Sequence, residues 1–211
     1  MIKIDKRTSP SFLHTLQKKG RSYQDLPHSS DEHYIQELRR YLIEEQHGLC
    51  GYCCSGITTD NSHNEHMRPQ HAHSTQTLAY ENIIASCNHA NTCGRKKHGD
   101  NSPIVYPTSR DCEEQFEFNE FDGSVQGLTD LAEHTIDVLN LNEPSLCMAR
   151  LNTLYGISWC SYQDVYAQCY QEDMPEWLQY ADIVRYVLRK YRTNWEAFQQ
   201  VFRQLYDRVD E

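Results

Sequence analysis

Two pairs of cysteines constrain the fold of this chain more than any other feature. Cys50 and Cys53 are separated by two residues, and Cys87 and Cys93 are separated by five. A Cys-x-x-Cys turn presents two thiolates to one metal ion, and a second pair completes the tetrahedral site in which zinc is held. Because a closed four-ligand site has no open position for substrate, we expect a structural zinc that replaces a core too small to hold this segment together.

The longer spacing of the second pair leaves other ligand sets open. Cys54 can take the place of Cys53, and His89 can take the place of Cys93. A redox role for the Cys-x-x-Cys turn is a weaker interpretation, because no βαβ pattern surrounds it. The remaining cysteines follow no metal-binding spacing and are interpreted as buried thiols: Cys112, Cys147, Cys160 and Cys169.

Composition favours a folded cytoplasmic protein. The 211 residues are 38% hydrophobic and 24% charged, which suits a packed core. There is no run of about 18 apolar residues, so no membrane span is expected, and the opening MIKIDKRTSPSFL lacks the apolar segment of a signal peptide. In the cytoplasm the nine cysteines stay reduced, which argues against a disulfide framework.

The net charge of −10 is distributed unevenly. Residues 1–46 carry 8 Lys and Arg against 7 Asp and Glu, and residues 47–110 carry 5 against 4. Residues 111–211 carry 7 against 19, so the acidity is confined to the last region. An acidic surface does not attract nucleic acid by itself, so we expect a partner protein to deliver or hold the substrate.

The pattern of apolar residues divides the chain into three regions. Residues 1–46 form an arm and a helix, with partner docking as the expected role, and residues 47–110 form the zinc-binding core. Residues 111–211 form a hairpin around Asp122-Gly123 and an acidic helical region that begins near 129. The apolar side chains expected to fill pockets of a partner are Ile2, Ile4, Phe12 and Leu13.

A candidate catalytic group lies between the cysteine pairs, where Glu65 and His66 are adjacent and Asn82 lies five residues before Cys87. Phosphodiester hydrolysis needs a base that activates water and a cation that stabilises the developing charge. Imidazole suits the base, and a carboxylate can hold a divalent ion. Adjacent strand residues point to opposite faces, so Glu65 and His66 share a pocket only where the strand bends or ends. Asn82 is expected to hydrogen-bond across this loop and to orient His66.

Basic side chains in the same region are candidate phosphate ligands. Arg95, Lys96 and Lys97 follow the last predicted zinc ligand, where they can hold phosphate. Arg68 follows the Glu-His pair and is assigned the same role. His63 is interpreted as a solvated loop residue.

These residues resemble the zinc-containing HNH endonuclease family. Several phrases, among them IKIDKRTSPSF, EEQHGLCGYC, CGRKK and HTIDVLNLN, resemble one subfamily, the HNH nuclease component of Septu-type anti-phage systems, which also occurs as a retron effector. The resemblance covers roughly residues 1–155. The motif that carries it is Cys50-x-x-Cys53, Glu65-His66-x-x-Pro69, Asn82-x-x-x-x-Cys87 and Cys93.

The resemblance implies an α+β fold, in which a mainly helical chain surrounds a small zinc-stapled ββα-metal nuclease core. It implies that His66 is the general base, that Glu65 is a ligand of a catalytic Mg²⁺ or Mn²⁺, and that Asn82 is the middle asparagine of the family name. Family members usually carry His or Asn directly after the last zinc ligand, whereas this chain has Gly94. The second metal ligand is then expected at His98, or else at Asp100.

The resemblance also implies partners. Members of the subfamily act with an ABC-like ATPase, and the retron systems add a reverse transcriptase with its RNA and DNA. The expected function is therefore metal-dependent cleavage of nucleic acid, with DNA as the expected substrate, in anti-phage defence. The alternative is a catalytically inactive zinc-knuckle adaptor of the same complex, which the glycine at position 94 favours.

Overall fold

A computed structural model describes residues 1–170 and 178–207. Residues 171–177 and 208–211, which belong to the predicted region 111–211, lie outside the described residues. The described chain combines helices with two separate two-stranded sheets, so the predicted α+β class is confirmed. None of the helices in these described ranges is both long enough and apolar enough to cross a bilayer.

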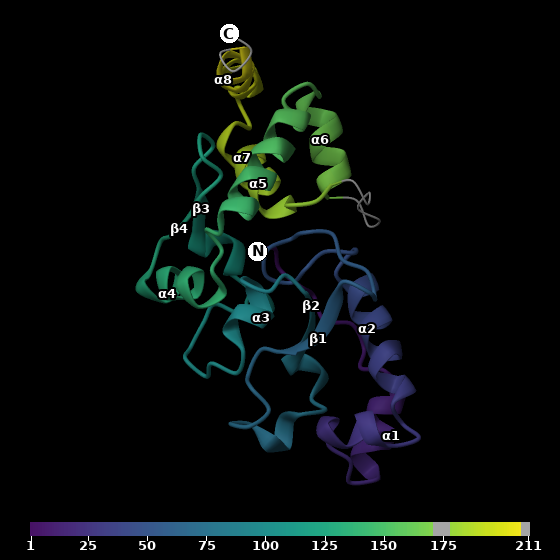
Figure 1. Ribbon diagram of the computed structural model, residues 1–211. Coiled ribbons are helices and arrows are strands. Elements are labelled where there is room, and N and C mark those ends of the chain that lie inside the picture. Colours follow the sequence, from purple (N-terminus) through teal and green to yellow (C-terminus); the bar gives the residue numbers. More distant parts are fainter. Residues whose placement is uncertain (171–177, 208–211) are drawn as a thin grey trace.

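Figure 1 shows helices α5 to α8 at one end of the molecule and α1 at the other, with the first sheet and α3 between them. The α-helices are α1 (Ser11–Lys18), α2 (His33–Glu45), α3 (Cys93–Lys97), α4 (Asp130–Leu139), α5 (Pro144–Ile157), α6 (Tyr162–Cys169), α7 (Ala181–Lys190) and α8 (Trp195–Asp207). The strands are β1 (Ser62–His66), β2 (Ile83–Cys87), β3 (Phe116–Phe118) and β4 (Val125–Gly127). The 3-10 helices are η1 (Tyr23–His28), η2 (Ser74–Gln76), η3 (Tyr80–Asn82) and η4 (Cys112–Gln115).

The first sheet and helix α3 form a β1–β2–α3 unit. The two strands are antiparallel, with Asn64 opposite Ala85 and His66 opposite Ile83. Helices α2 and α3 both contact β2. Because side chains alternate along a strand, Glu65 points toward α3, whereas Asn64 points toward α2, where its amide donates to the carbonyl of Ile35. The predicted order of strand, strand and helix is present, while membership of the nuclease family stays a prediction.

Gln46 completes the hydrogen bonding of β2 on the edge that β1 leaves open. Its Oε1 accepts from Ala85 N at 2.7 Å, and its Nε2 donates to Ala85 O at 2.9 Å and to Leu49 O at 2.8 Å. Gly51 N also donates to Ala85 O, at 3.0 Å. A buried amide side chain thus takes the place of a third strand, since buried backbone groups must be paired.

The N-terminal arm belongs to the protein's own core. Ile2, Ile4 and Leu13 are buried, and Phe12 is partly buried and stacks on Tyr34 with 4.7 Å between ring centroids. The prediction that these side chains fill pockets of a partner is therefore wrong for Ile2, Ile4 and Leu13, because the chain itself covers them. Docking of a partner by another surface of residues 1–46 stays a prediction.

The second hairpin forms where the sequence predicts it, with Asp122 and Gly123 between β3 and β4. Gly123 has φ of 71°, and a Cβ there would lie 2.1 Å from Cys147 O, so only glycine fits. The buried Arg150 of α5 donates to Gly123 O at 3.1 Å and to Leu141 O at 2.9 Å. These bonds attach the hairpin to the helical region that follows.

We expect Gln46→Ala to lower the free energy of unfolding by about 3 kcal/mol, because it leaves the buried Ala85 N and Leu49 O without partners. Urea unfolding of the purified protein measures this. The control is Gln36→Ala, an exposed glutamine on α2, the helix that ends just before Gln46, for which we expect a change within about 0.5 kcal/mol. Equal stability of the two variants would contradict the role given to Gln46.

Candidate metal centre and adjoining cavity

Four buried thiols converge beside the β1–β2–α3 unit. They belong to Cys50, Cys53, Cys87 and Cys93, and their sulfur atoms all lie within 4.8 Å of one another. Zn–S distances of about 2.3 Å place tetrahedral sulfurs about 3.8 Å apart, and Cys53 Sγ lies 4.0 Å from Cys87 Sγ. The predicted ligand set is confirmed as a cluster, and its donors fit a metal ion such as zinc.

Local structure brings the two cysteine pairs together. The bridge between Leu49 and Gly56 closes the turn that carries the first pair. Cys87 ends β2 and Cys93 begins α3, so the second pair spans the loop between them. Cys87 N donates to Cys50 Sγ at 3.3 Å, which joins the two pairs and favours a thiolate.

The alternative ligands lie outside the cluster. Cys54 is buried, but burial raises the pKa of its thiol, and its carbonyl accepts from Tyr180 N at 2.7 Å. His89 is exposed on the loop between β2 and α3. The other cysteines are also separate from the cluster: Cys112 and Cys169 are buried, and Cys147 and Cys160 are partly buried.

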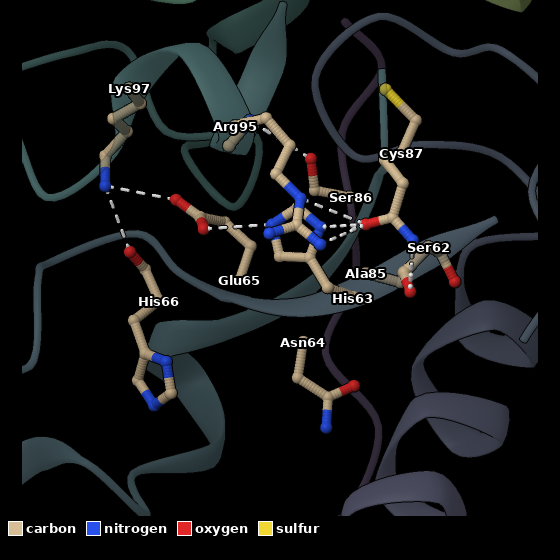
Figure 2. Close-up of polar contacts among 12 residues, drawn as sticks. Ser62, His63, Asn64, Glu65, His66, Ala85, Ser86, Cys87, Arg95 and Lys97 are labelled. Atoms are coloured by element: carbon tan, nitrogen blue, oxygen red, sulfur yellow. Dashed lines mark hydrogen bonds and ion pairs between the residues drawn. The ribbon is translucent and has the colours of Figure 1, made fainter. Parts of the chain in front are cut away.

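Glu65 is at the centre of a polar group between β1 and α3, drawn in Figure 2. Its Oε1 accepts from Lys97 Nζ at 3.1 Å, and the same ammonium donates to His66 O at 3.1 Å. His63 Nε2 lies 3.4 Å from Glu65 Oε2. Burial acts to raise the pKa of Glu65, but the contacts from His63 and Lys97 outweigh it, and the pKa lies below its usual value. Glu65 is therefore a carboxylate at neutral pH.

His63 is held from its other side by Asn88. Asn88 Oδ1 lies 3.0 Å from His63 Nδ1 and accepts from Arg95 Nη2 at 2.9 Å, while Asn88 Nδ2 donates to Ser62 O at 3.1 Å. The interpretation of His63 as a solvated loop residue is wrong, since it lies in β1 with 18% of its side chain exposed. The signal that could have found it is its position two residues before Glu65, on the same face of a strand.

His66 points to the opposite side of β1, away from Glu65 (Figure 2). Only 6% exposed, it places Nε2 at 2.9 Å from Thr77 O and packs edge-on against Tyr23. A carbonyl can only accept, so Nε2 carries the proton and Nδ1 accepts from Gln70 Nε2 at 3.2 Å. Burial lowers the pKa of His66, which keeps the ring neutral.

A cavity of about 320 Å³ opens where β1 ends, and both Glu65 and His66 line it. Glu65 and His66 can therefore share a pocket, because the strand ends at His66. Asn64, Gln70 and Lys97 also line the cavity. Asn64 Oδ1 and Gln70 Oε1 are buried without a hydrogen-bond partner among the described residues, so both are available to water or to a ligand.

Asn82 makes the hydrogen bonds expected across the loop. Its Oδ1 accepts from Arg68 N at 2.8 Å, and its Nδ2 donates to Arg68 O at 2.9 Å. Met67 N also donates to Asn82 O, at 3.0 Å. These bonds fix the backbone directly after His66, and the role of Asn82 in orienting the histidine stays a prediction.

His98 and Asp100, the predicted metal ligands, are not brought to Glu65. Helix α3 ends before them, with His98 exposed at φ of 36°. Asp100 instead accepts from Ser102 N at 2.7 Å and from Ser102 Oγ at 2.6 Å. Among the residues that the structure describes, polar contacts to the Glu65 carboxylate come from the β1 histidine and the α3 lysine only.

The predicted phosphate ligands lie in three different environments. Arg95 and Lys96 are exposed on α3 and can meet a phosphate. Lys97 is only 4% exposed and its ammonium is paired with Glu65, so its assignment as a free phosphate ligand is wrong. Arg68 is exposed, but it lies over the ring of Tyr106 beside a different cavity.

No protein-family model matches the chain, and no curated protein matches it at a significant level.

We expect Asn82→Ala to lower the free energy of unfolding by about 2 kcal/mol, because both backbone groups of Arg68 lose their partner. Asn82→Asp keeps the acceptor for Arg68 N but sets a carboxylate against Arg68 O, so it should not restore stability. Denaturant unfolding measures both variants, with the exposed neighbour Glu81→Ala as control. Wild-type stability of Asn82→Ala would show that these bonds do not hold the loop.

Proposed function

We propose that the protein is a metal-dependent endonuclease of the HNH type that hydrolyses phosphodiester bonds of nucleic acid, with DNA as its substrate. One observation carries the proposal. A neutral histidine with an unprotonated Nδ1 and an ionised glutamate line the same cavity, at the end of a strand in a β1–β2–α3 unit beside four clustered thiols.

His66 is suited to act as the general base. The bond from Nε2 to Thr77 O fixes the tautomer and leaves Nδ1 as the proton acceptor. Water that replaces the Gln70 amide at Nδ1 gives up a proton to it while its oxygen attacks phosphorus. The bond from phosphorus to the 3′ oxygen breaks, and that oxygen takes a proton from solvent.

Glu65 is suited to hold the catalytic cation, because its carboxylate is ionised and borders the cavity. A bound Mg²⁺ or Mn²⁺ supplies the charge that stabilises the phosphorane and the leaving oxygen. Arg95 and Lys96 are placed to bind a neighbouring phosphate of the strand.

The four-cysteine cluster would hold a structural zinc. All four ligands come from protein, so no position is open to substrate. The zinc would fix the start of α3, and with it the lysine that holds Glu65.

The role in anti-phage defence and the ABC-like ATPase partner are supported by the resemblance of residues 1–155 to the Septu subfamily. The surplus of acidic residues in the last region supports a partner as well, since the chain cannot rely on its own charge to gather DNA. A retron reverse transcriptase with its RNA and DNA is the partner expected in the retron form of the system.

The second candidate function is an inactive adaptor with the same fold. The contact between Lys97 and Glu65 favours it, because an ammonium already neutralises the carboxylate that would hold the cation. Cleavage of DNA that depends on added Mg²⁺ or Mn²⁺ would decide for the nuclease, and its absence in the complete complex would decide for the adaptor.

For the cluster, we expect elemental analysis to find one zinc per chain. Cys53→Ser should lose the metal and unfold at lower denaturant, because binding of a structural zinc contributes directly to folding. Cys54→Ser, which changes a buried thiol outside the cluster, should keep the zinc. Zinc loss in Cys54→Ser with retention in Cys53→Ser would reverse the ligand assignment.

For the chemistry, we expect His66→Ala to reduce cleavage by about 10²–10⁴-fold, because the general base is lost. Zinc content and folding should stay normal. The control is His14→Ala, an exposed histidine on α1. Cleavage of a DNA duplex with Mn²⁺ measures both variants, and wild-type rates for His66→Ala would rule out the assignment.

A further inference from the structure

We infer that His63 is the second protein ligand of the divalent cation, and that the pair His63 and Glu65 binds Mn²⁺ in preference to Mg²⁺. The inference deepens the proposed function, because it concerns the cation of the same site. In this inference both ligands lie on β1, whereas the prediction from the sequence put the second ligand after α3, at His98 or Asp100.

The hydrogen bonds around Asn88 fix which nitrogen of His63 is free. Asn88 Nδ2 donates to Ser62 O, and Arg95 Nη2 donates to Asn88 Oδ1, so the orientation of the amide is determined. Asn88 Oδ1 then faces His63 Nδ1 at 3.0 Å as an acceptor, and Nδ1 carries the proton. In the neutral ring Nε2 then carries the lone pair, and metal-binding histidines are commonly held by such a bond on the other nitrogen.

The free nitrogen faces a second acceptor. His63 Nε2 lies 3.4 Å from Glu65 Oε2. The Nε2 lone pair of a neutral ring repels the carboxylate unless a cation lies near both, and that cation is either a second proton on Nε2 or a metal ion that takes its place. Donor atoms at about 2.1 Å from one ion lie about 3 Å apart when the angle between them is near 90°, so this separation suits two ligands of a single ion.

Gly94 lets both donor side chains approach helix α3 closely. A Cβ at this position would lie 2.7 Å from both His63 Nε2 and Glu65 Oε2. Any side chain at position 94 would therefore displace the two donor atoms, while water or a phosphate oxygen can complete the coordination of the ion. Lys97 binds the other oxygen, Oε1, and leaves Oε2 for the ion.

The donor pair determines the preferred metal. An imidazole nitrogen binds Mn²⁺, although more weakly than it binds the later first-row ions, whereas Mg²⁺ prefers an all-oxygen octahedron with several waters. With only two protein ligands, most coordination positions stay open, which is what a cation that binds a phosphodiester requires.

The test measures Mn²⁺ binding to the full-length, zinc-loaded protein by electron paramagnetic resonance. We expect His63→Ala and Glu65→Gln each to weaken Mn²⁺ binding at least tenfold, and Asn88→Ala to weaken it about 10–100-fold. Gly94→Ala should weaken it as well, since its methyl group displaces the two donor side chains. Two control variants should bind Mn²⁺ like wild type. They are His98→Ala and Gly56→Ala, and the Cβ of the second would meet the end of the Gln179 side chain at 2.9 Å.

Zinc content and unfolding monitor the fold of each variant, and if His63→Ala does not fold, Asn88→Ala and Gly94→Ala provide the same test. Wild-type Mn²⁺ affinity in His63→Ala, no saturable binding by the wild type, or displacement of Mn²⁺ by an equal concentration of Mg²⁺ would each overturn the inference. These results are separate from those of the nuclease assay. If no variant or wild type cleaves DNA but His63→Ala still loses Mn²⁺, the proposed function fails and the metal site stands.

Discussion

The position of helix α3 depends on the four-cysteine cluster. The helix has only five residues, too few to be stable alone, and Cys93 attaches its first residue to the turn of Cys50 and Cys53 and to the end of β2. Everything that α3 brings to the site follows from this attachment. Gly94 lies against Glu65 because it follows the anchored cysteine, and Lys97 returns to the same inward side one turn later.

The alternation of side chains along β1 puts the proposed cation ligands and the proposed general base on opposite faces of the strand. One face holds His63 and Glu65, next to α3, and serves the cation in the proposed mechanism. The other face holds His66, whose ring bonds to Thr77 O, and serves the proton. The two functions meet because the strand ends at His66, where both faces open onto one cavity.

The sequence predicts best where spacing alone determines geometry. The four thiol ligands, the hairpin at Gly123 and the bonds of Asn82 across the loop could all be anticipated. The second ligand that we infer for the cation could not be anticipated, because His63 lies on β1 and not in the segment that follows Gly94. Lys97 was misjudged because a run of basic residues does not reveal which member faces inward. The buried arm was misjudged because the residues that cover it are far away in the sequence.

The distribution of charge bears on how strongly the protein could bind nucleic acid without a partner. In the last region, Glu113 pairs with Arg185 and Arg189, and Glu120 pairs with Lys190. These pairs do not change the net charge of the region, so its surplus of acidic residues remains and disfavours the approach of DNA at short range. Screening limits this repulsion to about 8 Å at physiological salt, so binding at the site depends on local charge, which comes chiefly from Arg95 and Lys96. Two such contacts give weak binding with a shallow salt dependence, so in the proposed function a partner that supplies further phosphate contacts would set the affinity for nucleic acid.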